Sequence, residues 1–169
     1  MEIGHHERIQ VFHETSTLIN QKIRLTLACN CTPVVCIDEG NQKLTLLAFR
    51  NRLTKQLTSY LHTITPAEIQ QIIFAYEPGW AIGQKEAAPA EFVHTAHQAL
   101  REIMAGLVTT ETAERVRLIY GGSVSKENAG KIIANADVDG VFIGRFGHEP
   151  RNYQAILELV KTGGEQDDN

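Results

Sequence analysis

The chain has 169 residues, of which 43% are hydrophobic and 21% are charged, and this ordinary globular composition permits one compact unit with a sizeable core. The formal charge of −4 and a sequence pI near 6.0, with no basic run, argue against nucleic acid or an anionic membrane as a partner and favour a small molecule. No apolar stretch approaches the length of a membrane span, and the N-terminus lacks the features of a secretory signal, so we expect a cytoplasmic protein.

Apolar residues alternate between helical and strand-like spacing along the first part of the chain. Three of them at four-residue spacing predict a helix, and the apolar run that follows predicts a strand. A stripe of leucines then predicts a long helix, and a threonine, a proline and a glutamate form the capping box of a short helical turn. The first helix is indicated by Ile19, Ile23 and Leu27, and the strand spans residues 32–37. The leucine stripe consists of Leu46, Leu53, Leu57 and Leu61, and the capping box spans residues 65–68.

The second part of the chain continues this alternation without an obvious linker. Strands are predicted at residues 72–76, 116–120 and 138–143. Because helices separate the strands, we expect right-handed crossovers and a parallel sheet. Three helices are predicted between and after these strands. The first begins at Pro89, and the other two span residues 126–134 and 153–160. The apolar stripe of the first helix consists of Phe92, Ala96, Leu100 and Met104.

Glu77 follows the apolar run at residues 72–76, and Pro78 ends that strand by removing a backbone donor. The glutamate is therefore predicted at the carboxyl end of a buried parallel strand. Loops converge on a crevice at that edge of α/β folds, so Glu77 is a candidate general base. The alternative is a surface or salt-bridged glutamate without a catalytic role.

Two glycine turns follow the next two predicted strands, at residues 120–124 and 142–146. Glycine lets the backbone approach a ligand closely, and amides that enter a helix N-terminus attract anions. Ser123 adds an amide and a hydroxyl to the first turn. The two turns together favour phosphate binding, although each alone is also typical of a tight turn.

Metal binding is not expected from the cysteine and histidine patterns. Cys29, Cys31 and Cys36 are an odd number with no second cluster to complete a zinc site or a disulfide framework, so we expect reduced, structural thiols. His5 and His6 are adjacent on a predicted strand and should therefore point to opposite faces.

Four segments match, in chain order, the motifs of one known family. Residues 3–8 (IGHHER) resemble its strand-four signature, which usually reads Gly-His-Ser-Glu-Arg, and residues 32–37 (TPVVCI) resemble its strand five. Residues 76–83 (YEPGWAIG) resemble its strand six with a mobile lid, and residues 120–124 (YGGSV) resemble its strand-seven phosphate turn. The chain thus resembles the C-terminal two-thirds of a member of the triosephosphate isomerase family.

This resemblance implies an α/β fold of the TIM (β/α)8 barrel type that is incomplete, with units four to eight only, over residues 1–162, followed by a polar tail at 163–169. In the family, the missing portion supplies an asparagine, the active-site lysine and much of the dimer interface. The family's homodimer is therefore not carried over to this chain. An open sheet would also leave two apolar edges, so we expect the chain to need a complementing N-terminal segment.

The resemblance implies an isomerase that interconverts glyceraldehyde 3-phosphate and dihydroxyacetone phosphate through an enediolate. Glu77 would abstract the proton next to the substrate carbonyl, and His5 would hydrogen-bond to the carbonyl oxygen. Gly83, Ser123 and Gly144 would bind the phosphate of the sugar-phosphate substrate through backbone amides. No metal or organic cofactor is implied, because this proton transfer needs only a base and an electrophile. Glu7 would orient neighbouring charges, or would be a plain surface residue.

Several positions depart from the family pattern. Arg145 replaces a second glycine and would bind phosphate through its amide or its side chain, and Gly79 replaces a common valine, which adds freedom at the first turn of the lid. These departures, together with the sequences of residues 84–89 and 143–150, resemble the erythrulose-phosphate isomerase branch of the superfamily. The four-carbon substrate of that branch is the alternative to glyceraldehyde 3-phosphate. A third alternative is a non-catalytic phosphate-binding remnant that lacks the N-terminal lysine. A purely structural protein would not explain why the motifs occur in family order.

Overall fold

The computed structural model describes residues 1–40, 43–82 and 88–162. Its centre is a parallel sheet of five strands in the order β1-β2-β3-β4-β5, so that each strand pairs with its neighbour in sequence. The predicted parallel α/β architecture is therefore confirmed. The strands are β1 (Glu2–Ile3), β2 (Val34–Ile37), β3 (Ile73–Tyr76), β4 (Arg117–Tyr120) and β5 (Gly140–Val141).

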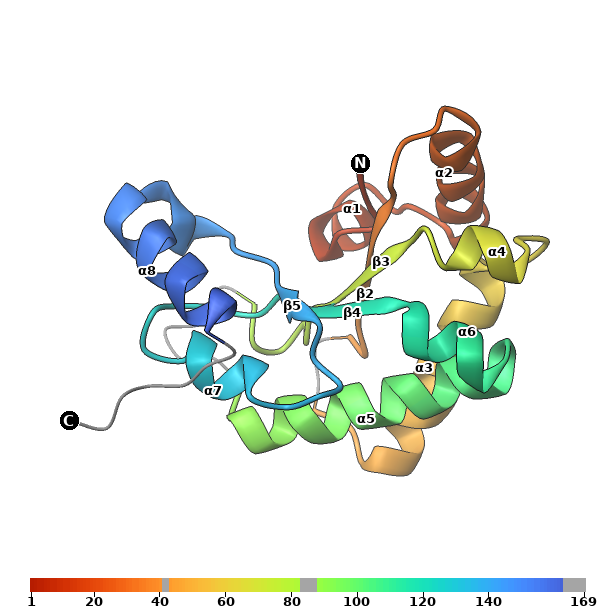
Figure 1. Cartoon of the computed structure of the whole chain (residues 1–169). Helices are drawn as coiled ribbons and strands as arrows, with labels where there is room; N and C mark the ends of the chain where they lie inside the picture. Colours follow the sequence, from red (N-terminus) through yellow and green to blue (C-terminus); the bar gives the residue numbers. More distant parts are fainter. Residues whose placement is uncertain (41–42, 83–87, 163–169) are drawn as a thin grey trace.

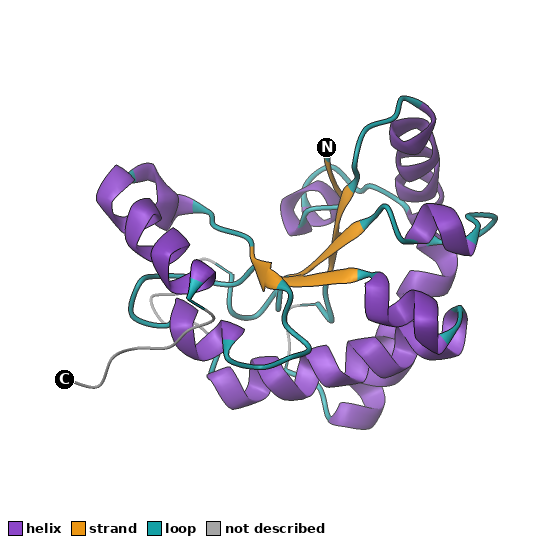
Figure 2. Ribbon diagram, viewed as in Figure 1, coloured by secondary structure: helices purple, strands orange, loops and turns teal. Residues whose placement is uncertain are grey.

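Helices connect the strands and lie along one side of the sheet, with α3, α5 and α6 beneath it and α2 and α8 at its two ends (Figures 1 and 2). None of the helices in the described ranges has both the length and the apolarity that a membrane crossing requires. The helices are α1 (His6–Gln10), α2 (Ser16–Ala28), α3 (Leu46–Tyr60), α4 (Pro66–Ile69), α5 (Ala90–Leu107), α6 (Thr110–Arg115), α7 (Ala129–Ile133), the 3-10 helix η1 (Arg145–His148) and α8 (Pro150–Lys161).

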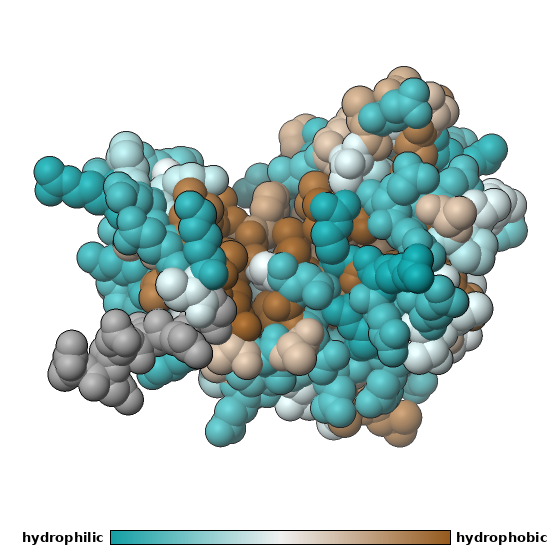
Figure 3. Space-filling view, viewed as in Figure 1, coloured by the Kyte–Doolittle hydropathy of each residue, from teal (hydrophilic) through white to brown (hydrophobic). Residues whose placement is uncertain are grey.

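The two faces of the sheet have different surroundings. Ile37, Tyr76 and Tyr120 lie in one row of the register, and all three are buried on the helix side. Side chains alternate along a strand, so Glu77, the residue after Tyr76, points to the opposite face. Figure 3 shows the molecule hollowed between α8 and α2, with hydrophobic residues at the floor of the hollow. The described residues thus cover one face of the sheet more completely than the other.

A buried histidine lies on the helix side of the sheet. The ring of His97, on α5, is 5.7 Å from the Tyr76 ring and 6.3 Å from the Tyr120 ring, and its Nδ1–H donates to the Val93 carbonyl over 3.0 Å. Burial lowers the pKa of His97 to about 4, because an apolar environment disfavours the charged imidazolium.

His97 should make the chain less stable in acid. A depressed folded-state pKa means that its contribution is fully present above the ordinary value of 6.5 and is lost as the pH falls toward about 4. The loss amounts to roughly 3 kcal/mol of unfolding free energy. Urea unfolding of His97→Gln should depend less on pH across this window than the parent chain, whereas the exposed control His62→Gln should follow the parent. Equal pH dependence in all three proteins would contradict this prediction.

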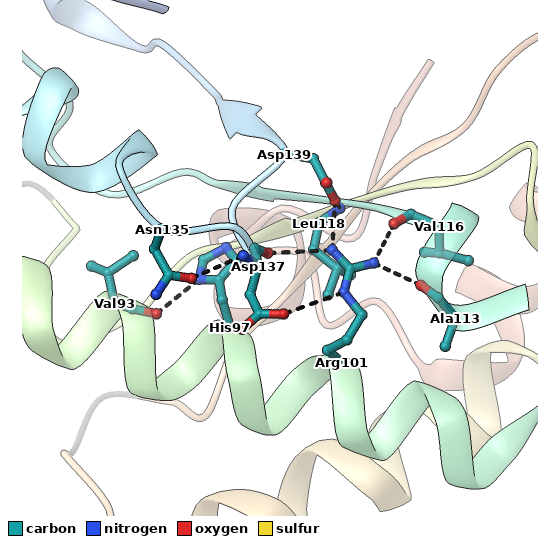
Figure 4. A network of polar contacts seen from close by, with 9 residues as sticks. All are labelled: Val93, His97, Arg101, Ala113, Val116, Leu118, Asn135, Asp137 and Asp139. Atoms are coloured by element: carbon teal, nitrogen blue, oxygen red, sulfur yellow. Dashed lines mark hydrogen bonds and ion pairs between the residues drawn. The ribbon is translucent and has the colours of Figure 1, made fainter. Parts of the chain in front are cut away.

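Arg101 of α5 fixes the start of β4 (Figure 4). Its guanidinium donates to the carbonyls of Ala113 and Val116, both over 2.6 Å, and to the Asp139 carboxylate over 2.7 Å. The backbone N–H of Leu118 donates to the same carboxylate over 2.6 Å. These bonds join α5, α6, β4 and the residues before β5, and they hold β4 in the position from which the following loop begins.

The predicted elements are mostly present, with differences in length. The capping box is confirmed, since the Thr65 side chain accepts from the Glu68 N–H and the Glu68 carboxylate accepts from the Thr65 N–H. The helix predicted at 126–134 is only Ala129–Ile133, and the strand predicted at 138–143 is only Gly140–Val141. The short helices α1, α6 and η1 were not predicted, because segments of this length show no clear hydrophobic period. The predicted tail at 163–169 lies outside the described residues.

The apolar stripe predicted for the long helix α3 was partly wrong. Leu53 and Leu57 are buried as expected, and Leu61 is buried too but follows the last residue of the helix. Leu46 is exposed, and the rest of the buried helical face comes from Phe49 and Tyr60. The two aromatic residues lie on the same helical face as the buried leucines, at helical spacing. The buried face of this helix therefore could not be predicted from its leucines alone.

The three cysteines differ in their surroundings. All three are free, as expected, but Cys29 and Cys31 are exposed after α2, whereas Cys36 is buried within β2. The structural role predicted for all of them therefore fits Cys36 alone.

Candidate active site

A cavity of about 540 Å³ opens at the carboxyl ends of the strands. It brings together five of the six predicted site residues, which arrive from four separate segments of the chain. Gly83, the sixth, lies outside the described residues. The predicted residues that line the cavity are His5, Glu77, Ser123, Gly144 and Arg145.

Glu77 is held in the cavity by the sheet. Its backbone N–H donates to the Ile37 carbonyl over 2.9 Å, and the N–H of Gly121 donates to the Tyr76 carbonyl over 2.8 Å, so the ladder continues past β3. A Cβ at Gly121 would lie only 2.6 Å from Glu77 Cγ. Gly121 therefore makes room for the carboxylate, a role that sequence reasoning missed because it depends on register across two strands.

The environment of Glu77 favours its protonated form. Only 3% of the residue is exposed, and burial raises the pKa of its carboxyl to about 7. A hydrogen bond from the Cys36 thiol opposes this pKa increase, while the negative charges of Glu2 and Asp38 add to it. A carboxylate with a pKa near neutrality both accepts and returns a proton readily, as a general base requires.

The raised pKa has a consequence for stability. Folded Glu77 holds its proton more tightly than the unfolded chain does, so its own contribution to stability is fully present below pH 4.5 and is lost as the pH rises through about 7. Glu77→Gln removes this penalty, so at pH 8 it should unfold with a free energy up to about 3 kcal/mol above the parent. At pH 4.5 the two should be similar. Urea titrations at both pH values, with exposed Glu114→Gln as control, test this; a pH-independent difference would contradict it.

His5 lies at the turn between β1 and α1. The two histidines were predicted on one strand, but that prediction was wrong: β1 ends at Ile3, and Gly4 turns the chain with a φ of +74°, which favours glycine. His5 faces the cavity, whereas Nδ1 of His6 lies 3.2 Å from an Asp38 carboxylate oxygen. The pair is thus separated as expected, for a different reason.

The hydrogen bonds of His5 define which ring nitrogen faces the site. Its Nδ1 accepts the backbone N–H of Glu7 over 3.4 Å, so a neutral ring carries its hydrogen on Nε2. Nε2 lies 3.8 Å from Glu77 Oε1, which is adjacent but too long for a hydrogen bond. The Nε2–H is therefore positioned to donate to a ligand oxygen beside the carboxylate. The side chain of Glu7 is exposed, and its backbone rather than its carboxylate contacts His5.

Both glycine turns reach the cavity, but only one leads directly into a helix. Gly144 precedes η1 immediately, whereas α7 begins at Ala129, well after Ser123. The expectation that both turns place amides at a helix N-terminus is therefore wrong for the first. Instead, Asn128 holds this turn: its Nδ2 donates to the Ser123 carbonyl and its Oδ1 accepts from the Ser125 N–H, both over 2.9 Å. The spacing of Ser125 and Asn128 is the sequence signal that indicates this turn.

Charge at the cavity is mixed. Glu2, Glu7 and Glu77 contribute carboxylates, and Arg145 is the one arginine or lysine among the described lining residues. The Arg145 guanidinium carbon lies 5.5 Å from the centre of the Phe146 ring. The permanent positive charge that a ligand anion would meet in this cavity is thus the Arg145 guanidinium. Within the described ranges, no group of three or more His, Cys, Asp or Glu residues is arranged to hold a metal ion.

Comparison with known proteins gives consistent matches. A profile of the family described as Triosephosphate isomerase matches residues 1–160. "Probable triosephosphate isomerase 2" of Listeria monocytogenes is 47% identical over 165 residues, which cover 97% of this chain and 64% of that protein. "Triosephosphate isomerase 2" of Listeria innocua gives the same values. "Triosephosphate isomerase" of Streptococcus thermophilus is 34% identical over 159 residues, which cover 94% of this chain and 63% of the relative.

The chain spans about 64% of the length of the Listeria relatives that it matches. The family profile nevertheless extends through all five strands of the sheet and through the loops that line the cavity. The chain therefore belongs to the triosephosphate isomerase family.

Proposed function

We propose that this chain carries the reacting groups of an isomerase that interconverts aldose and ketose phosphates, with glyceraldehyde 3-phosphate and dihydroxyacetone phosphate as substrates. The observation that carries the proposal is the buried Glu77 carboxylate, whose pKa is raised to about 7, beside the Nε2–H of His5 in one cavity. The names of the relatives point to the same reaction.

In the proposed reaction, Glu77 takes the proton from the carbon next to the substrate carbonyl, and the electron pair of that C–H bond moves toward the carbonyl oxygen. The Nε2–H of His5 donates to this oxygen and stabilises the negative charge of the resulting enediolate. The hydroxyl proton of the enediolate passes to the former carbonyl oxygen, and protonated Glu77 returns its proton to the carbon that bears this oxygen. The oxygen that has lost its proton becomes the new carbonyl, which completes the isomerisation. A base with a pKa near neutrality serves both directions of this transfer.

Phosphate binding is proposed at the part of the cavity that the two glycine turns line. The amides of Ser123 and Gly144 and the charge of Arg145 are the groups near which the phosphate would lie, together with Gly83. In support, Asn128 holds the Ser123 turn in place. The position of Gly122 is also restricted, since a Cβ there would overlap the Tyr120 hydroxyl.

We also propose that residues 1–162 form units four to eight of a TIM barrel and act together with a complementing N-terminal segment. In support, β1 and β5 each pair on one side only within the described sheet. Glu2, Val34, Ile73 and Arg117 share a register row on the less covered face, and neither Glu2 nor Arg117 is buried. A further strand on either side would enclose this face.

A second candidate is the isomerisation of erythrulose phosphate. The Listeria relatives whose names carry the number 2 are 47% identical to this chain, whereas the relative from Streptococcus thermophilus named without a number is 34% identical. This difference, together with Arg145 at the phosphate turn, favours a separate branch of the family. The chemistry of Glu77 and His5 would be unchanged. A phosphate-binding remnant without turnover is the candidate of another class.

The test combines the chain with the portion of the Listeria monocytogenes relative that lies outside the match. Isomerisation of glyceraldehyde 3-phosphate and of erythrulose phosphate is measured for the chain alone, for the mixture, and for mixtures with Glu77→Gln or the exposed control Glu114→Gln. Activity that requires Glu77 but not Glu114 supports the isomerase, and the better substrate identifies the branch. A folded mixture that binds inorganic phosphate without turnover of either substrate would favour the remnant.

A further inference from the structure

The residues that follow Glu77 are anchored by one large side chain. Ala81 donates its N–H to the Pro78 carbonyl over 2.8 Å, which closes a turn around Trp80. The indole Nε1–H donates to Oε1 of the buried Glu39 over 2.5 Å. The indole ring also packs edge-on against Phe92, with ring centres 5.1 Å apart and planes at 78°.

Lys43 adds a charge to this aromatic pair. Its Nζ lies 4.9 Å from the centre of the Phe92 ring and 5.7 Å from the centre of the Trp80 ring, within the range of cation–π attraction. Lys43 precedes α3, Phe92 lies in the first turn of α5, and Trp80 follows β3. The contact therefore joins three segments that are distant in sequence.

The backbone between Glu77 and Trp80 has little freedom to move independently. Pro78 restricts one φ angle. A Cβ at Gly79 would lie 2.7 Å from the Gly40 carbonyl oxygen and 3.0 Å from Cε1 of His6. Gly79 is thus confined by its neighbours, whereas the sequence indicated only added freedom. Because the segment is short and closely packed, the position of the indole should be transmitted to the Glu77 carboxylate.

We propose that Lys43 and Phe92 are positioning residues, which hold the Trp80 indole and thereby orient the Glu77 carboxylate in the cavity. The catalytic part of this inference rests on the proposed function, whereas the restraint on Trp80 does not. Lys43 acts through Trp80 and not through the substrate, since it is absent from the described lining of the cavity.

Trp80 is the only tryptophan of the chain, so intrinsic fluorescence reports directly on this contact. Acrylamide quenching is measured for the parent chain and for Lys43→Met, Lys43→Arg and Phe92→Leu, with the exposed Lys55→Met as a charge-matched control. Lys43→Met and Phe92→Leu should raise the population of quencher-accessible indole about two- to fivefold, the range expected for an exposed cation–π contact. Lys43→Arg and Lys55→Met should resemble the parent. Far-UV circular dichroism verifies that each variant folds.

The second measurement uses the complemented enzyme. Lys43→Met should lower kcat about two- to fivefold, the same factor as for quenching. KM should change little, because the orientation of the base changes while the phosphate contacts remain. Lys43→Arg should have the kcat of the parent. Unchanged quenching in Lys43→Met and Phe92→Leu would overturn the restraint on Trp80. Increased quenching with unchanged kcat would overturn the positioning role. A mixture with the parent chain that shows no turnover would instead refute the proposed function. Acrylamide quenching alone would then show whether Lys43 and Phe92 restrain the Trp80 indole.

Discussion

Glu77→Gln is expected to lower kcat of the complemented enzyme by about 10²- to 10⁴-fold, the range that a positioned general base contributes. Glutamine has the same shape but cannot accept the substrate proton. Phosphate affinity should change little, because the proposed phosphate contacts come from other segments of the cavity. Steady-state kinetics and binding of inorganic phosphate measure the two effects separately.

Glu77→Asp separates the position of the base from its chemistry. Aspartate retains a carboxylate but withdraws it by one methylene, and a displacement of about 1 Å can cost about 10²-fold in rate. Glu77→Asp should therefore be impaired with a pH–rate profile that still shows an essential base, whereas Glu77→Gln should lose that ionisation. Wild-type kcat in Glu77→Gln would refute the assignment of the base.

Gly121→Ala should lower kcat by about 10²-fold without direct contact with the substrate, since small displacements of a reacting group have effects of this size. The new Cβ would lie 2.6 Å from Glu77 Cγ and 3.1 Å from its Oε1, so the carboxylate must move. Because the side chain is buried against the sheet, it has few alternative positions.

Gly106→Ala is the matched control for this substitution. Gly106 lies near the end of α5, and a Cβ there would meet no atom within 4 Å. Alanine should be neutral or should stabilise the helix by about 0.5–1 kcal/mol. The two variants therefore differ in the space around the added methyl group. Equal kcat for Gly121→Ala and Gly106→Ala would show that Glu77 tolerates the new methyl group and that the predicted displacement does not occur.

Sequence patterns predicted the parts of this fold that depend on local order. Apolar runs separated by helical stripes specified a parallel sheet, and parallel strands carry their following loops to the same edge. This is why Glu77 and Ser123 could be expected together although they are far apart in sequence, whereas His5 was placed with them only by the family resemblance. The family resemblance then supplied their proposed roles.

Features that depend on contacts between distant segments were not predictable from the sequence. The close approach of Gly121 to the Glu77 side chain follows from strand register, and the environment of His97 follows from the packing of α5 on the sheet. The cation–π contact of Lys43 with Trp80 likewise joins residues without a shared period. The start of α7 was misplaced because Asn128 bonds to the preceding turn, which delays the helix.

Transfer of a substrate proton to Glu77 is tested most directly by hydrogen exchange with solvent. Dihydroxyacetone phosphate is incubated in D₂O with the complemented enzyme, and deuterium at the carbon next to the carbonyl is followed by proton NMR. We expect deuterium incorporation with the parent enzyme and with Glu114→Gln, and its loss with Glu77→Gln. Deuterium incorporation at the parent rate in Glu77→Gln would show that another group removes the substrate proton.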